Sequence, residues 1–169
     1  MNQRTKKNKI LIVDFGSQVT KLIARRIRDH KVFSEIVTPN DLKKKDVFKN
    51  VVGIILSGGP STVTEKNFPR IPKEIFNLGV PILGICYGLQ LIAKHFKGKI
   101  KSNIKKREFG RAVLFKSKES LLTKGFFKKN KSNVWMSHQD SVYNLPNGFT
   151  KIAKTKESTI TIIENKLKR

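Results

Sequence analysis

Short runs of aliphatic and β-branched residues alternate with helix-like segments over the first hundred residues, and this alternation constrains the fold most. The predicted strands lie at 9–13, 32–38, 51–56 and 80–85. The segment 18–29 has apolar residues at helical spacing. The run at 51–56 is apolar apart from Gly53, which is typical of parallel strands buried on both faces. The pattern predicts an α/β fold with an open, mostly parallel, doubly wound sheet.

The pattern changes after about residue 100, where predicted strands no longer alternate with helices. These strands lie at 109–115, 134–142, 149–154 and 158–164. Strands without helical crossovers pair antiparallel, so we expect antiparallel or mixed additions to the sheet in the C-terminal third. The basic segment 1–8 is predicted to be a disordered tail. The length suits a single domain over 9–169.

The chain is strongly basic, with a formal net charge of +24 over 169 residues. Its lysines are spread along the sequence, without the interleaved aromatic residues that stack on bases. We therefore expect a solvated surface that could face an acidic partner, and no specific nucleic-acid partner. No apolar run approaches the roughly 20 residues of a membrane span, so we expect a cytoplasmic protein without a membrane partner.

The single cysteine, Cys86, lies between a predicted strand and a predicted helix in the sequence Gly-Ile-Cys-Tyr-Gly. Gly84 and Gly88 leave room for the sharp turn that a strand–nucleophile–helix elbow requires. The dipole of the following helix is expected to favour the thiolate. The pattern favours a nucleophilic cysteine over the buried, inert cysteine that is more usual.

Two further turns are predicted to lie beside Cys86, because the carboxyl ends of parallel strands meet at one edge of a sheet. They are Asp-Phe-Gly at 14–16 and Ser-Gly-Gly-Pro at 57–60. Acyl transfer requires N–H donors where the oxyanion develops. We expect these donors to be the N–H groups of Gly59 and of Tyr87, which follows the cysteine.

Longer motifs around these turns resemble the glutamine amidotransferase domains of GMP synthases, a branch of the cysteine-dependent class I amidotransferases. Gly-Ile-Cys-Tyr-Gly and Ser-Gly-Gly-Pro are typical of the whole class. The motifs that point to GMP synthases are Asp-Phe-Gly-Ser-Gln at 14–18, Arg-Glu-Phe-Gly at 107–110 and Trp-Met-Ser-His at 135–138. The resemblance covers residues 9–164.

The resemblance implies a glutaminase in which Cys86 attacks the side-chain amide of glutamine while Gly59 and Tyr87 hold the oxyanion. It implies that the amino-acid end of glutamine is bound by Gln90, Ser137, His138, Gln139 and Asp140. Ammonia would pass to a synthetase domain or subunit, which aminates XMP to GMP with ATP and Mg²⁺. No cofactor or metal is implied for the amidotransferase part itself.

Two features depart from the family pattern. The family's general base and its orienting carboxylate are a His and a Glu in a Phe-His-Pro-Glu motif, which these 169 residues do not contain. The family also usually has Gly where Gln139 stands. Loss of the imidazole slows turnover by orders of magnitude, so we expect a C-terminally incomplete domain that is inactive or severely impaired. His138 and Asp140 have a triad-like spacing, but the motif match assigns them to substrate binding.

Three functions are compatible with these features. The first is a truncated GMP synthase, or its separately encoded amidotransferase subunit. The second is a non-catalytic module that docks on a synthetase partner, which the basic surface and the absent His and Glu would suit. The third is another class I amidotransferase, or a cysteine hydrolase that acts on a different amide or ester.

Overall fold

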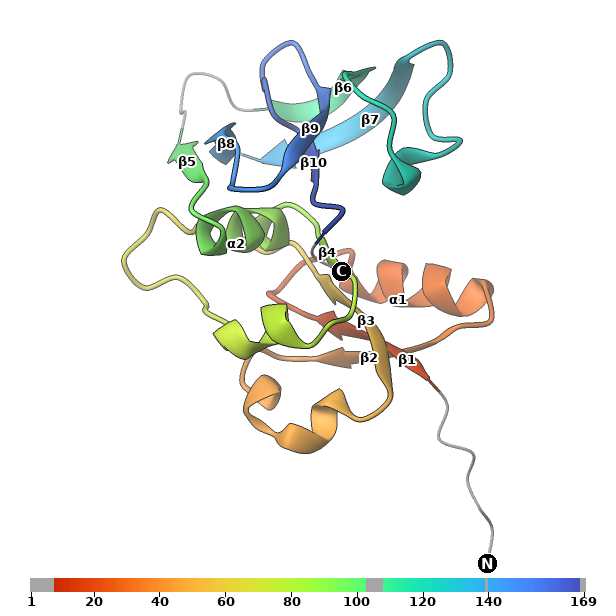
Figure 1. Ribbon diagram of the computed structural model, residues 1–169, viewed down its shortest axis with the longest axis vertical. Coiled ribbons are helices and arrows are strands. Elements are labelled where there is room, and N and C mark those ends of the chain that lie inside the picture. Colours follow the sequence, from red (N-terminus) through yellow and green to blue (C-terminus); the bar gives the residue numbers. More distant parts are fainter. Residues whose placement is uncertain (1–7, 103–107, 139, 168–169) are drawn as a thin grey trace, which may run out of the picture. The chain divides into compact units, whose positions relative to one another are not determined.

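The computed structural model describes residues 8–102, 108–138 and 140–167 (Figure 1). Contacts group these residues into two compact units, one within residues 1–91 and the other within residues 92–168. Each unit is described by itself below. Of the predicted tail at 1–8, only Asn8 lies among the described residues, and a single domain over 9–169 stays a prediction.

A parallel sheet of four strands, in the order β2–β1–β3–β4, forms the centre of the first unit. The strands are β1 (Lys9–Val13), β2 (Phe33–Val37), β3 (Val51–Leu56) and β4 (Ile82–Gly84). The core lies on this sheet, where the side chains without exposed surface include Leu11, Ile12, Val13 and Leu56. Every strand falls within a run predicted from the sequence, so the predicted parallel α/β sheet is confirmed.

Helical segments connect these strands, as parallel neighbours require. α1 (Thr20–Asp29) joins β1 to β2 and contacts β2. Two 3₁₀ helices, Asp41–Lys43 and Lys45–Phe48, precede β3, and a third, Lys73–Asn77, precedes β4. α2 (Tyr87–His95) begins three residues after the end of β4. The short connection between β4 and α2 therefore contains the predicted elbow.

The second unit is built from antiparallel strands. One sheet has the order β10–β9–β6–β7, and a separate two-stranded sheet pairs β5 with β8. The strands are β5 (Lys99–Ser102), β6 (Glu108–Lys116), β7 (Lys131–His138), β8 (Asp140–Asn144), β9 (Thr150–Lys154) and β10 (Ile162–Glu164). A 3₁₀ helix, Leu121–Thr123, lies between β6 and β7.

The antiparallel strands predicted for the C-terminal third are thus confirmed, but they form sheets of their own. The run predicted as one strand at 134–142 is two strands that belong to different sheets: β7 ends at His138 and β8 begins at Asp140. β5, with the sequence Lys-Ile-Lys-Ser, has no counterpart among the predicted strands.

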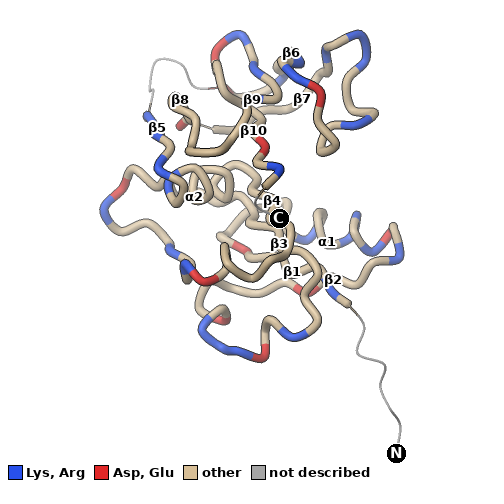
Figure 2. The backbone as a smooth tube through the Cα atoms, viewed as in Figure 1, with Lys and Arg blue, Asp and Glu red and all other residues tan. Residues whose placement is uncertain are grey.

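Lys and Arg residues occur in both units, and Figure 2 marks their positions in blue along the backbone. This spread agrees with the scattered lysines of the sequence. No helix within the described ranges is long and apolar enough to cross a membrane.

Candidate active site

The elbow at Cys86 has the strained backbone that the sequence predicts. Cys86 has a φ of 49°, in the left-handed region that costs a residue with a side chain about 1–2 kcal/mol. It follows β4 directly after Ile85, and its carbonyl accepts the hydrogen bond of Gln90 N at 3.2 Å, in the first turn of α2. Strain of this kind persists only where the surrounding structure imposes it.

The elbow is packed against β3 too closely for a side chain at Gly88. A Cβ atom at this position would lie 2.1 Å from the backbone oxygen of Leu56. The amide of Gly88 donates to Ser57 O at 3.1 Å, and the amide of Ile85 donates to Leu56 O at 2.9 Å. Gly84 ends β4, opposite Leu56 in the parallel register. Gly88 therefore allows the close approach of elbow and strand.

The turn at 57–60 lies directly against the cysteine. A Cβ atom at Gly58 would lie 3.4 Å from Cys86 Cβ. The Ser57 side chain is fully buried; its hydroxyl accepts from Phe15 N at 3.2 Å and donates to Gly58 O at 2.9 Å. A Cβ at Gly59 would lie 2.4 Å from Phe15 O. The three predicted turns therefore meet at one edge of the sheet.

Asp14 organises the first of these turns. Its Oδ1 atom accepts hydrogen bonds from the amides of Gly16 at 2.9 Å and Ser17 at 3.3 Å, and from the hydroxyl of Thr20 at 2.8 Å. The carboxylate thus links the end of β1 to the start of α1. Its bonding pattern assigns Asp14 to holding the turn rather than to accepting a proton from the cysteine.

Two amide groups beside Cys86 are suited to bind an anion. Tyr87 is the first residue of α2, where N–H groups have no intrahelical acceptor and the helix dipole is positive. Within the described part of the chain, neither Tyr87 N nor Gly59 N donates a hydrogen bond. These are the two donors that the sequence predicts for an oxyanion.

The side chain of Tyr87 anchors the elbow. It is almost completely buried, its ring lies edge-on to Phe15 with centroids 4.9 Å apart, and its hydroxyl donates to Pro69 O. Burial, and next the negative charge of Glu65, raises the pKa of this phenol. The neutral hydroxyl is therefore the form that holds the backbone of Tyr87 beside the cysteine.

The Cys86 thiol is less acidic than expected. Cys86 is exposed at its outer side, yet the protein around its sulfur desolvates the thiolate, and this burial raises the pKa of the thiol. This burial acts against the ionisation that the dipole of α2 is expected to favour. A nucleophile with a raised pKa needs a base to take its proton.

The residues predicted to bind the amino-acid end of glutamine occur in both units. Gln90, in the first unit, is buried on α2, and its Oε1 accepts from Val63 N at 3.3 Å. In the second unit, Ser137 is exposed on β7, His138 ends β7, and Asp140 is buried at the start of β8. Gln139 lies outside the described residues.

Sequence reasoning missed the surroundings of His138: Glu108 lies next to its ring, and Thr155 is hydrogen-bonded to Glu108. Glu108 Oε2 lies 3.2 Å from His138 Nε2, and Glu108 Oε1 accepts from the Thr155 hydroxyl at 2.6 Å. The Arg-Glu-Phe-Gly motif contained a signal for Glu108, since a carboxylate among apolar strand residues requires a partner when buried. Thr155 follows β9 and carried no such signal. The other two histidines fit structural roles: His30 is exposed after α1, and His95 lies edge-on to Phe96.

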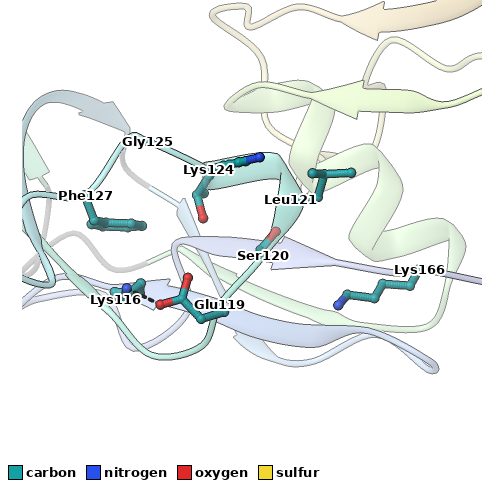
Figure 3. A pocket seen from close by; sticks show the side chains of 9 residues that line it. Lys116, Glu119, Ser120, Leu121, Lys124, Gly125, Phe127 and Lys166 are labelled. Atoms are coloured by element: carbon teal, nitrogen blue, oxygen red, sulfur yellow. Dashed lines mark hydrogen bonds and ion pairs between the residues drawn. The ribbon is translucent and has the colours of Figure 1, made fainter.

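A surface cavity of about 350 Å³ lies in the second unit (Figure 3). Its lining includes Lys116, Glu119, Ser120, Leu121 and Lys166, and Lys116 forms an ion pair with Glu119. It contains none of the predicted site residues. Among the described residues, no group of three or more His, Cys, Asp or Glu side chains is placed to hold a metal ion.

The sequence matches the model of a known family around this same elbow. The family model for class-I glutamine amidotransferases matches residues 11–169. The chain belongs to this family. Its membership confirms the predicted resemblance, and with it the prediction of an enzyme family.

The curated relatives are longer proteins. The chain is 52% identical over 161 residues to "GMP synthase [glutamine-hydrolyzing]" of Prochlorococcus marinus strain AS9601, which covers 95% of this chain and 30% of that protein. It is 48% identical over 163 residues to the protein of the same name from Aquifex aeolicus strain VF5, with 95% and 31% covered. The chain therefore spans about 30% of the length of the curated relatives it matches.

Solved structures share the fold. A crystal structure of a protein assigned as a GMP synthase subunit, from Thermoplasma acidophilum, has a TM-score of 0.81 at 29% identity and covers 96% of this chain and 80% of that one. A glutamine amidotransferase from Thermotoga maritima has a TM-score of 0.74 at 18% identity, with 93% and 71% covered. The α/β architecture is thus that of known glutamine amidotransferases.

Proposed function

We propose that this chain is the glutamine amidotransferase part of a GMP synthase, which hydrolyses glutamine to glutamate and ammonia. The observation that carries the proposal is the strained Cys86, with φ 49°, between β4 and the first turn of α2. The unpartnered amides of Gly59 and Tyr87 beside it supply the complementary donors. The names of the longer curated relatives support the choice of GMP synthase within the family.

In the proposed reaction, Cys86 Sγ attacks the carbon of the glutamine side-chain amide. The carbonyl oxygen becomes an oxyanion that accepts hydrogen bonds from Gly59 N and Tyr87 N. The C–N bond then breaks, ammonia leaves with the proton it requires, and a thioester to Cys86 remains. Water hydrolyses the thioester, which releases glutamate and restores the thiol.

The remaining requirement is a base. The raised pKa of Cys86 means that a neighbouring group must accept its proton and return it to the leaving ammonia. The family's His and Glu motif does not occur in these 169 residues. We therefore propose that this chain binds glutamine and presents the nucleophile, but turns over poorly on its own.

The proposed contacts to the substrate and the partner follow the family. Gln90, Ser137, His138, Gln139 and Asp140 are proposed to bind the amino-acid end of glutamine. Ammonia is proposed to pass to a synthetase domain or subunit, to which ATP, Mg²⁺ and XMP belong. The net charge of +24 would favour an acidic surface on this synthetase, and the same feature supports the second candidate function, a docking module without catalysis.

Covalent labelling tests the nucleophile without requiring turnover. A diazoketone that mimics glutamine, with its amino-acid end intact, is expected to add once, at Cys86, as located by peptide mass spectrometry. Excess glutamine should protect Cys86, and asparagine should not. A Cys86→Ala chain is the matched control, which should take no label. Labelling that glutamine does not slow, or equal labelling by unrelated acyl electrophiles, would favour a hydrolase of another substrate class.

A turnover assay tests the missing base. Glutamate production by this chain is expected to be more than tenfold below that of an intact amidotransferase domain from a named relative. Turnover within tenfold of such a domain would overturn the proposal of impaired activity. Addition of a synthetase partner without stimulation or complex formation would count against the docking module.

A further inference from the structure

The surface cavity of the second unit is lined by three lysines from different segments of the chain (Figure 3). Lys116 ends β6, Lys124 directly follows the 3₁₀ helix Leu121–Thr123, and Lys166 lies two residues after β10. The cavity has a volume of about 350 Å³, within the range of ligand pockets, about 300–1,000 Å³. The fold of this unit therefore brings three positive charges to one cavity.

These charges are only partly compensated. Glu119 is the one carboxylate among the described residues that line the cavity, and it forms an ion pair with Lys116, drawn as a dashed line in Figure 3. The side chain of Lys116 is 20% exposed, whereas that of Glu119 is 84% exposed. Lys124 and Lys166 form no ion pair within the described ranges. The cavity is therefore suited to bind further carboxylates.

A buried serine links two of the segments that carry these lysines. Ser120 is 7% exposed; its hydroxyl donates to Glu164 Oε1 at 2.8 Å and accepts from Leu122 N at 3.0 Å. This link joins the 3₁₀ helix before Lys124 to the strand before Lys166. It limits how far the two segments can separate, and a site that is formed before its ligand arrives loses less free energy on binding.

The cavity also has an apolar part. Leu121 is 80% exposed, and Phe127 beside it is half-buried. An exposed apolar side chain with charged residues around it is typical of a protein interface, which has an apolar centre and a polar rim. A free inorganic anion would gain nothing from Leu121, whereas a peptide segment would bury it.

Charge and composition exclude two other occupants. A second copy of this chain would be repelled, because each copy has a formal net charge of +24. Single-stranded nucleic acid binds where bases stack on exposed aromatic rings, and Phe127, the one aromatic residue among the described lining residues, is half-buried. An acidic peptide matches both the lysines and the exposed leucine.

We propose that this cavity binds an acidic segment of another protein, whose carboxylates pair with Lys116, Lys124 and Lys166 and whose apolar side chain packs on Leu121. The segment takes the place of Glu119 at Lys116. Glu119 is therefore an internal competitor, which lowers the affinity for the segment. The proposal does not depend on the chemistry of Cys86.

A designed peptide serves as the probe. The fluorescein-labelled sequence Gly-Glu-Glu-Leu-Glu-Glu-Gly is titrated with the whole chain at an ionic strength of about 0.1 M, and Kd is measured by fluorescence anisotropy. The same peptide with Gln in place of Glu should bind at least about tenfold more weakly. Because a chain of this charge attracts any acidic peptide, matched variants must decide whether the cavity is the site.

Glu119→Gln is the decisive variant, because it should tighten binding. Removal of the competing carboxylate frees Lys116, so Kd should fall about threefold, the effect of one partly exposed ion pair. Glu157→Gln makes the same charge change at an exposed carboxylate outside the lining, and its Kd should change by less than about 1.5-fold. Equal tightening in both variants, or none in Glu119→Gln, would overturn the proposal.

Two losses complete the test. Lys124→Gln should raise Kd about threefold, while Lys154→Gln, at an exposed lysine on β9 outside the lining, should leave it nearly unchanged. Leu121→Ser should raise Kd about fivefold, because the apolar contact is lost. Leu78→Ser, in the first unit, is the control for that change. Circular dichroism verifies that each variant is folded.

The leucine variant separates a peptide site from other anion sites. If Lys124→Gln weakens binding, Leu121→Ser does not, and millimolar inorganic phosphate displaces the peptide, the cavity is a simple anion site and the proposal is overturned. An oligothymidylate that binds more tightly than the peptide, and whose Kd responds to Lys124→Gln but not to Leu121→Ser, would also overturn it. Loss of peptide binding in both variants, with tightening in Glu119→Gln, is the result that supports it.

Discussion

Replacing Gly88 by Ala tests how closely the elbow is packed against β3. The added Cβ would lie 2.1 Å from Leu56 O and 2.7 Å from Leu56 C and Cβ, whereas Cβ contacts under 3.0 Å are essentially absent from real proteins. The blocking atoms belong mainly to the backbone of a buried strand, so no side chain can rotate away. The elbow and the strand must therefore move apart by about an ångström.

The expected magnitude follows from the contacts that this movement disturbs. Overpacking costs about 1–3 kcal/mol. The hydrogen bonds from Gly88 N to Ser57 O and from Ile85 N to Leu56 O would both stretch, at about 1 kcal/mol each. Ala regains about 1 kcal/mol over Gly because it favours the helix. We expect a net loss of about 3 kcal/mol in the free energy of unfolding, which lowers Tm by about 6–12 °C.

Urea and thermal unfolding, followed by far-ultraviolet circular dichroism, measure this loss. Gly79→Ala is the control: Gly79 has φ 70°, and a Cβ there meets no atom within 4 Å. That variant should lose only the cost of the backbone conformation, about 1 kcal/mol. A Gly88→Ala chain as stable as the wild type would refute the packing argument, since helix propensity alone would then decide the sign.

Three further predictions concern the same edge of the sheet. In urea unfolding, the free energy of unfolding of Cys86→Gly should exceed that of Cys86→Ala by about 1 kcal/mol, because only Gly adopts φ 49° without strain. The opposite order would contradict strain at the elbow. Alkylation of Cys86 by iodoacetamide should rise with pH through a midpoint above that of an unstructured cysteine peptide, since burial raises the pKa of the thiol and only the thiolate reacts; a midpoint below that of the peptide would mean that the helix dipole dominates. Ser57→Ala should cost about 1–3 kcal/mol, because Phe15 N loses its buried acceptor, whereas Ser102→Ala on the exposed β5 should change stability by less than about 0.5 kcal/mol.

The parallel strands could be predicted because burial on both faces leaves a continuous apolar run, as at β3. β5 could not be predicted, since its Lys-Ile-Lys-Ser sequence is short, polar and mostly exposed. The change of sheet between β7 and β8 could not be predicted either, because the sequence continues from one strand into the next without turn residues. Sequence periodicity reports which faces are buried, but not which strand is the neighbour.

The elbow and its glycines were visible in the sequence for a local reason. Where two backbone segments lie very close together there is no room for a side chain, so positions 59 and 88 must be glycine. The partners of His138 were not visible, because Glu108 and Thr155 are 47 residues apart in the chain and meet only through the strand order. The direction of the Cys86 pKa also required the structure, since desolvation depends on atoms from other turns.

The placement of one exposed thiol has a consequence for oxidation. Cys86 is the only cysteine of these 169 residues, so a sulfenic acid formed on it has no second thiol in the chain to resolve it as a disulfide. Further oxidation would be irreversible and would remove the nucleophile permanently. Desolvation raises the pKa of the thiol and so lowers the fraction of thiolate, the form that attacks peroxide. The environment of the elbow therefore slows the oxidation of Cys86.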